Sequence, residues 1–262
     1  MKIVVCIKQV IDPEAPVSSF AIDEEARKAI PPKGTPPVLN PYDENALEAA
    51  LLLKDSQEAE ITVLSMGPQI ARPVIKKALA VGAASLILIE DAACDQLDSN
   101  ASAAILTAAI KKIGEFDVII CGRQASDTDA GQVGSGIAAM LGLPCVTAIQ
   151  KVEAADGTLK IQRVVADGYD LIDCRTPAVL TASSEIGDLR MASVKQVMAA
   201  AKMQPTVWSL ADLGVDPATL KKKNTIRMYQ PVTEIDTVII VGETPEEAGA
   251  ALAVKLSEDG II

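Results

Sequence analysis

The sequence contains no histidine. This absence excludes Ser-His-Asp and Cys-His catalytic groups, and it removes the side chain that most often binds transition metals. Any chemistry therefore has to come from carboxylates, lysine, cysteine or tyrosine, or from a bound cofactor.

Aromatic residues are also scarce, at 2% of the chain, although 49% of its residues are hydrophobic. The core therefore has to be built from alanine, valine, isoleucine and leucine. Such a composition suits a parallel sheet that is buried under helices on both faces.

Cysteines are few, odd in number and widely spaced. The five are Cys6, Cys94, Cys121, Cys145 and Cys174, and no two have metal-ligand spacing, so neither a zinc site, an iron–sulfur cluster nor a disulfide framework is indicated. Cys6 and Cys121 stand inside apolar runs, and we expect them to be small buried hydrophobic residues.

Positive charge is in deficit, and the net charge is −11. An acidic surface repels nucleic-acid phosphates and anionic membranes, so neither is an expected partner. No apolar run approaches the roughly 20 residues of a membrane span, and the N-terminus "MKIVVCIKQV" is too short for a signal sequence. These features predict a cytoplasmic protein without a membrane span.

Short apolar runs alternate with amphipathic stretches in the first part of the chain, which predicts an α/β fold with a doubly wound, mostly parallel sheet. Expected strands are 2–7, 60–66, 85–90, 117–122 and 177–184, with a hairpin over 159–175 around Asp167-Gly168. Expected helices are 40–55, 71–82, 99–114, 131–142, 191–203 and 244–260.

Two domains are predicted from the change of pattern at residue 205. Residues 1–204 form a nucleotide-binding α/β domain, and residues 205–262 form a C-terminal arm with few periodic apolar positions before its last helix. Because the arm cannot bury itself alone, we expect it to pack on a partner chain.

The stretch "CGRQASDTDAGQVGSG" (121–136) holds the richest candidate site. Gly131 and Gly134 permit a close backbone approach, and the following helix offers unpaired N–H groups to an anion. The loop is neither a Walker motif nor G-x-G-x-x-G. Its aspartates, Asp127 and Asp129, either accept hydrogen bonds from a ribose or an adenine amine, or cap the helix in a turn without a ligand.

These residues also carry a family resemblance. The chain resembles the beta subunits of electron transfer flavoproteins over nearly its whole length. The stretches that carry it are "VVCIKQVID" (4–12), "LNPYDENALEAAL" (39–51), "LSMGP" (64–68), "ALAVGA" (78–83), "CGRQASDTDAGQVG" (121–134), "DLRMASV" (188–194) and "LAVKLSEDGII" (252–262).

The resemblance implies a heterodimer in which the alpha subunit carries a redox FAD and the beta subunit holds a second adenine nucleotide. It also implies an adenine nucleotide alpha hydrolase-like fold whose C-terminal arm wraps the alpha subunit. The carried-over pocket residues are Cys6, Asn40, Pro41, Tyr42, Asp43, Met66, Gly122, Arg123, Thr128, Asp129, Ala130, Gly131, Gln132, Val133, Gly134 and Ser135.

Several of these residues have a second interpretation. Cys6 and Met66 are equally suited to plain packing, and Pro41 to shaping its turn. Asp43, or Asn40, is suited to capping the helix that follows.

The identity of the second nucleotide depends on small differences. Gln132-Val133-Gly134 after "CGRQA" resembles the FAD-binding, electron-bifurcating branch of the family. Ala130-Gly131 and Ser135 depart from the pattern of that branch, and the early "VID" (10–12) resembles the branch that holds structural AMP. We expect FAD, with AMP as the alternative.

Residues 187–203 correspond to the family's recognition segment, which docks a dehydrogenase through an aliphatic side chain. Val194 occupies that place, with Met198 and Arg190 as further docking candidates. The alternatives are an ordinary core face made by Val194, Val197 and Met198, and a surface ion pair of Arg190 with Asp188 or Glu185.

The predicted function is therefore electron transfer between NADH or a dehydrogenase, of acyl-CoA dehydrogenase type or another flavoprotein, and an acceptor such as ferredoxin. The protein positions flavins and no residue acts as a catalytic acid or base. Two other functions stay open: a stand-alone ATP- or AMP-binding protein of stress type, and a phosphoesterase whose metal binds Asp127 and Asp129.

Overall fold

The structure is a computed structural model that describes residues 1–16, 19–155, 157–231 and 237–262. The chain divides into two compact units, Met1–Arg227 and Met228–Ile262.

The first unit is built on a nine-stranded sheet with the order β11-β10-β9-β12-β8-β1-β6-β7-β13. The seven strands β9, β12, β8, β1, β6, β7 and β13, which are neighbours in that order, pair in parallel. The hairpin β10-β11 adds to this sheet antiparallel to β9. The strands are β1 (Lys2–Ile7), β6 (Glu60–Gly67), β7 (Ser85–Glu90), β8 (Val118–Gly122), β9 (Cys145–Ala155), β10 (Thr158–Val165), β11 (Gly168–Arg175), β12 (Ala178–Ala182) and β13 (Thr206–Trp208). The predicted mostly parallel sheet is thus confirmed.

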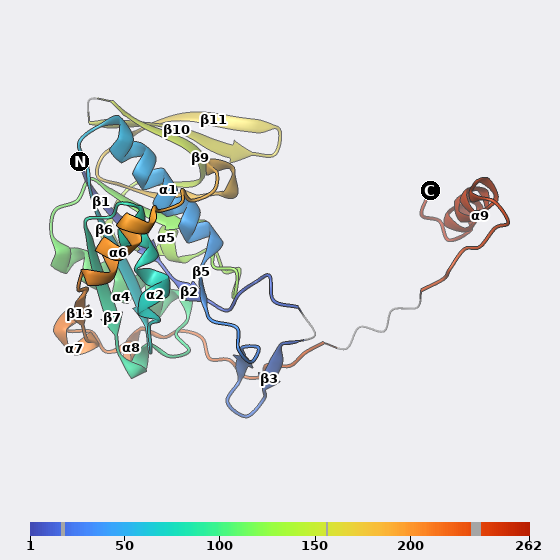
Figure 1. The fold of residues 1–262 in the computed structure, drawn as a ribbon, viewed down its shortest axis with the longest axis horizontal. Coiled ribbons are helices and arrows are strands. Elements are labelled where there is room, and N and C mark those ends of the chain that lie inside the picture. Colours follow the sequence, from blue (N-terminus) through green and yellow to red (C-terminus); the bar gives the residue numbers. More distant parts are fainter. Residues whose placement is uncertain (17–18, 156, 232–236) are drawn as a thin grey trace. The chain divides into compact units, whose positions relative to one another are not determined.

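Helices cover both faces of this sheet (Figure 1). One face packs against α1 (Pro41–Ser56), α2 (Arg72–Ile75), α3 (Lys77–Val81) and α6 (Val194–Lys202). The other face packs against α4 (Ser99–Ile113), α5 (Val133–Leu141) and α7 (Leu210–Leu213), and α8 (Pro217–Leu220) lies beside α4.

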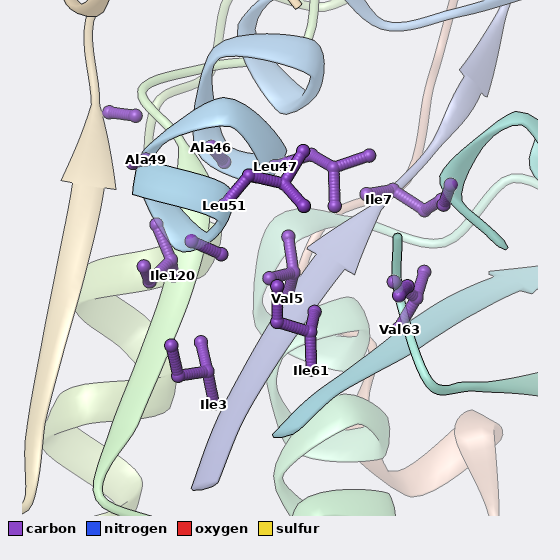
Figure 2. Close-up of a cluster of buried hydrophobic side chains, with 14 of the residues drawn as sticks. Ile3, Val5, Ile7, Ala46, Leu47, Ala49, Leu51, Ile61, Val63 and Ile120 are labelled. Carbon is purple, nitrogen blue, oxygen red and sulfur yellow. The ribbon is translucent and has the colours of Figure 1, made fainter. Parts of the chain in front are cut away.

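The core is aliphatic, as the composition predicts. Ile3, Val5 and Ile7 of β1 point toward Leu47 of α1, and all four side chains are nearly inaccessible to solvent (Figure 2). Val4 and Cys6 point to the opposite face and join the cluster under α4 and α5. Because both faces of β1 are buried, its sequence is a continuous apolar run.

The long connection between β1 and α1 contains two small sheets. β2 (Gln9–Val10) pairs with β5 (Val38–Leu39), and β3 (Ala21–Asp23) forms a hairpin with β4 (Lys28–Ile30). Neither was predicted, because strands of two or three residues are too short to show a period. The predicted helix 71–82 is divided into α2 and α3 at Lys76, whose ψ of −11° departs from the helical value.

The predicted boundary at residue 204 differs from the structure. The compact unit continues to Arg227, because β13 pairs with β7 and Leu210 is buried under α4. The second unit holds the predicted terminal helix, α9 (Pro245–Glu258), which Thr244 caps by accepting a hydrogen bond from the Glu247 N–H at 3.2 Å. Residues 232–236 of the predicted arm lie outside the described residues.

Candidate functional site

A cavity of about 950 Å³ opens where the order of the sheet reverses. The chain runs outward from β1 through β6 and β7, and then returns to place β8 on the other side of β1. Ligands of such sheets bind beyond the carboxyl ends of the strands at this switch point. The cavity lies there, since Cys6 and Ile7 of β1 and Cys121 and Gly122 of β8 line it.

Asn40 joins two of the loops at the switch point. Its side-chain N–H donates to the Gln124 carbonyl at 2.8 Å, and its side-chain oxygen accepts from the Ser126 N–H at 3.1 Å. Asn40 is completely buried. It precedes α1 but its side chain does not cap that helix, so the expected capping role is wrong, and its role is to hold the loop after β8 in place.

Asp43 joins the ends of β1 and β8. Its carboxylate accepts from the Lys8 N–H at 2.7 Å and from the Gly122 N–H at 3.2 Å, although the residue is only 7% exposed. Asp43 therefore does not cap its own helix either. Burial raises the pKa of its carboxyl group to about 7, against the opposing effect of its hydrogen bonds with Asn40, Lys8 and Gly122.

Gly122 allows this close approach. A Cβ at this position would lie 2.8 Å from the Tyr42 carbonyl oxygen and closer still to the Asp43 carboxylate. Gly134 is equally constrained, because a Cβ there would lie 2.6 Å from the Thr181 methyl group. The two glycines let the start of α1 and the first turn of α5 pack directly on the ends of the strands.

The aspartates of the loop after β8 do not cap α5. Asp127 forms an ion pair with the Lys8 ammonium group at 2.7 Å, and Asp129 accepts from the Gln124 side chain at 2.8 Å. The position before the helix is Gln132, and no side chain caps the first turn. The hypothesis of an aspartate-capped turn is therefore wrong, and the start of α5 at Gln132, Val133 and Gly134 lines the cavity.

Most of the predicted pocket residues are brought together by the fold. Those that line the cavity are Cys6, Asp43, Met66, Gly122, Arg123, Thr128, Ala130, Gly131, Gln132, Val133 and Gly134. Asn40, Pro41, Tyr42, Asp129 and Ser135 do not line it. The Arg123 guanidinium group lies over the Tyr42 ring, 5.9 Å from the centre of that ring. The Ser135 hydroxyl donates a hydrogen bond to the Gln132 carbonyl at the start of α5.

Two parts of the lining contain none of the predicted site residues. The segment after β7 lines the cavity from Cys94 to Asn100, and residues 222–225 line it from much later in the chain. The three consecutive lysines at 221–223, in a chain of net charge −11, are a sequence signal for an anion site. Their distance along the chain from the other lining residues concealed their connection with the cavity.

Two of the cavity thiols are poor nucleophiles. Cys6 and Cys121 stand opposite each other on β1 and β8 and are both buried. The neighbouring Cys6 thiol, together with burial, raises the pKa of the Cys121 thiol well above its ordinary value. Burial likewise raises the pKa of Cys94 to about 11. At neutral pH the Cys121 and Cys94 thiols are therefore uncharged, which favours a packing role over thiolate chemistry for these two residues.

Among the described residues, no group of three or more histidine, cysteine, aspartate or glutamate side chains is placed to hold a metal ion. Within the same residues, none of the helices has both the length and the apolar character that a bilayer crossing requires.

A second candidate surface lies on residues 191–198. Val194, Val197 and Met198 are 78%, 51% and 62% exposed, and Met191 is 96% exposed. The alternative of an ordinary core face is therefore wrong. Ser193 and Gln196 form a capping box that fixes the start of α6 beneath these side chains.

Arg190 is held away from that surface. Its guanidinium group pairs with Glu48 at 2.7 Å and with Asp55 at 2.8 Å, both on α1. The alternative of an ion pair with Asp188 or Glu185 is therefore wrong, because the chain folds back so that Arg190 lies over α1. The ion pair joins the segment before α6 to the helix that starts at the cavity.

Comparisons with known proteins agree with this architecture. Residues 33–213 match the electron transfer flavoprotein domain. The chain is 37% identical to the electron transfer flavoprotein subunit beta of Clostridium acetobutylicum and 36% identical to the caffeyl-CoA reductase-Etf complex subunit CarD of Acetobacterium woodii, in each case over 100% of both chains. It is 33% identical to the protein FixA of Azorhizobium caulinodans, over 98% of this chain and 94% of that protein. The chain therefore belongs to the electron transfer flavoprotein family, among its beta subunits.

Proposed function

We propose that this beta subunit binds an adenine nucleotide, FAD in preference to AMP, in the cavity at the switch point of the sheet. The observation that carries the proposal is the uncapped first turn of α5 at the edge of that cavity. The free N–H groups and the helix dipole favour an anion there. The same feature agrees with the adenine nucleotide alpha hydrolase-like fold that the family resemblance implies.

The residues that would hold the nucleotide divide by chemistry. The backbone at Gln132, Val133 and Gly134 suits a phosphate, because Gly134 brings it close to the strand ends without side-chain obstruction. The Thr128 hydroxyl suits a ribose or phosphate oxygen. Asn40 and Asp43 hold the loops that carry these groups and do not themselves have to touch the ligand.

The size of the cavity favours FAD over AMP. Its volume of about 950 Å³ lies near the upper end of the roughly 300–1,000 Å³ usual for ligand cavities, and a mononucleotide would leave much of it to water. The Val133 form of the loop, which resembles the FAD-binding branch, points in the same direction. A flavin bound here would supply redox chemistry by accepting and releasing electrons.

The subunit works, on this proposal, in a heterodimer whose alpha subunit carries another FAD. CarD is named as part of a caffeyl-CoA reductase complex, which supports a flavoprotein dehydrogenase as a further partner. Electron bifurcation, with NADH as donor and ferredoxin as one acceptor, is the form of electron transfer that two flavins would permit.

Two surfaces suit the protein partners. Val194 and Met198 present an exposed apolar patch for a dehydrogenase. In the second unit, Val238, Ile239 and Val241 are 63%, 78% and 81% exposed, and we propose that the alpha subunit covers them. On this proposal, the region of this chain that contacts the alpha subunit begins after Arg227 instead of at residue 205.

The nucleotide content of the purified heterodimer tests the proposal. The chain is co-expressed with its alpha subunit, the complex is denatured, and FAD, AMP and polypeptide are quantified in the extract. We expect two FAD per heterodimer. One FAD and one AMP would reject the FAD assignment and bifurcation, and one FAD with no second nucleotide would reject the cavity as a nucleotide site. A stable, flavin-free assembly of this chain alone in gel filtration would instead favour the stand-alone nucleotide-binding protein.

A further inference from the structure

The three-lysine segment, residues 221–223, lies across the start of α4 at the cavity. The Asn100 side chain donates to the Leu220 carbonyl at 2.7 Å. One oxygen of the Asp98 carboxylate accepts from the Lys222 and Lys223 N–H groups at 2.5 and 2.6 Å, while the other caps α4 through the Ala101 N–H. The backbone of the segment is thus fixed to the helix that borders the cavity.

The segment is also held from its other end. The Arg27 guanidinium group, between β3 and β4, donates to the Thr225 carbonyl at 3.0 Å. That hairpin is fixed in turn by the ion pair of Lys28 with Asp95 and by the bond from the Gln96 side chain to the Ala26 carbonyl. Residues 222–225 line the cavity because these contacts hold them there.

The lysine side chains retain unneutralised charge. The cavity carboxylates are already engaged, because Asp95 pairs with Lys28, Asp127 pairs with Lys8 and Asp98 accepts backbone N–H groups. Within the described part of the chain, no salt bridge joins Lys222 or Lys223 to a carboxylate. Two ammonium groups without a carboxylate partner among the described residues therefore stand at the rim of a cavity in a chain of net charge −11.

We propose that Lys222 and Lys223 bind the second phosphate of a dinucleotide whose first phosphate lies at the start of α5, and so select a diphosphate over AMP. This inference rests on the proposed nucleotide function. A single helix N-terminus supplies only about half of one positive charge, which is too little for a pyrophosphate. Ammonium groups on flexible stems act as point-charge phosphate ligands.

Binding of AMP and ADP to the full-length chain in complex with its alpha subunit tests the inference, because the two probes differ by one phosphate. After removal of exchangeable nucleotide, dissociation constants are measured by isothermal titration for the wild type and for the double variant Lys222→Gln/Lys223→Gln. We expect the double variant to weaken ADP binding about tenfold, equal to about 1.4 kcal/mol, and to change AMP binding less than about twofold. The ADP constant of the wild type should also depend more steeply on salt concentration than its AMP constant.

Two control variants separate position from charge. Lys221→Gln removes the neighbouring lysine, which does not line the cavity, and should leave both constants unchanged. Lys222→Arg/Lys223→Arg keeps the charge and should retain preferential ADP binding. Thermal unfolding midpoints within about 2 °C of the wild type would show that all variants are folded, as expected for exposed side chains.

The outcomes distinguish this inference from the proposed function. Two results would count against it: the wild type binds both AMP and ADP, and the double variant either keeps the full preference for ADP or weakens the binding of both nucleotides equally. Either result would show that the lysines do not bind the second phosphate, and the proposed nucleotide site would still be supported. If the wild type binds neither probe, the proposed function and this inference both fail.

Discussion

Gly122→Ala tests whether the end of β8 and the start of α1 must touch for the site to form. A Cβ at Gly122 would lie 2.7 and 2.8 Å from the carbonyl carbon and oxygen of Tyr42. The contacting atoms of Tyr42 belong to the backbone and cannot rotate away as a side chain could, so either β8 or α1 must shift. Either shift stretches the 3.2 Å bond from the Gly122 N–H to the Asp43 carboxylate.

The cost can be worked from these contacts. Overpacking of this kind costs about 1–3 kcal/mol, and a weakened hydrogen bond to a charged group adds up to about 1.5–3 kcal/mol. The reduced entropy of the unfolded chain returns about 0.4–1 kcal/mol. Because the first two terms overlap, we expect a net destabilisation of about 2–4 kcal/mol, which lowers the thermal midpoint by roughly 4–16 °C.

The matched control is Gly67→Ala. Gly67 ends β6 and lines the same cavity, but the nearest atom to its added Cβ is the Ile70 Cγ1 at an ordinary 3.5 Å. We expect its free energy of unfolding to stay within about 1 kcal/mol of the wild type. Both variants are followed by circular dichroism at one nucleotide concentration, because a bound ligand raises the midpoint. Equal midpoints for the two variants would refute the argument from close approach.

Two further predictions concern Asp43 and the exposed patch. The folded-state pKa of Asp43, about 7, lies above its ordinary 3.8, so the stabilising contribution of its protonated form is complete below about pH 4 and is lost as pH rises to about 7. In urea unfolding, the stability of the wild type relative to Asp43→Asn should therefore fall by about 2–3 kcal/mol between pH 5 and 7. A difference that does not change with pH would contradict the raised pKa. If Val194 anchors a dehydrogenase, Val194→Ser should slow electron transfer at limiting partner concentration by roughly 10–30-fold, with unchanged nucleotide content. The control Leu171→Ser changes a side chain of similar exposure (77%) on β11 and should not slow it. Equal rates for the two variants would contradict the docking role of Val194.

Local patterns in the sequence were sufficient for most of the fold. The apolar run at 2–7 predicted β1, because a strand that is buried on both faces is continuously apolar. The turn signal around Asp167-Gly168 predicted the β10-β11 hairpin, whose two turn residues are Ala166 and Asp167, with Gly168 as the first residue of β11. The terminal helix was equally plain, since Thr244 and Pro245 open it as a cap and first-turn proline. Strands β3 and β13, with three residues each, carried too little pattern to be seen.

The partners of the polar residues follow from the folded arrangement and not from local sequence. By sequence, Asn40 and Asp43 were suited to capping α1, and Asp127 and Asp129 to capping α5, because capping is a local interaction of such residues. The fold instead turns Asp43 toward Lys8 and Gly122, and Asp127 toward Lys8. These contacts join segments far apart in the chain, so no local pattern encodes them.

The same division applies to the site as a whole. The alternation of strands and helices and the glycine-bearing loop could be predicted from the sequence, since these features depend on neighbours along the chain. The tertiary structure alone brought residues 222–225 to the cavity at the end of β1, because that contact depends on hydrogen bonds from Asp98, Asn100 and Arg27 across the chain. Periodicity records which face of an element is buried, and not which distant segment covers it.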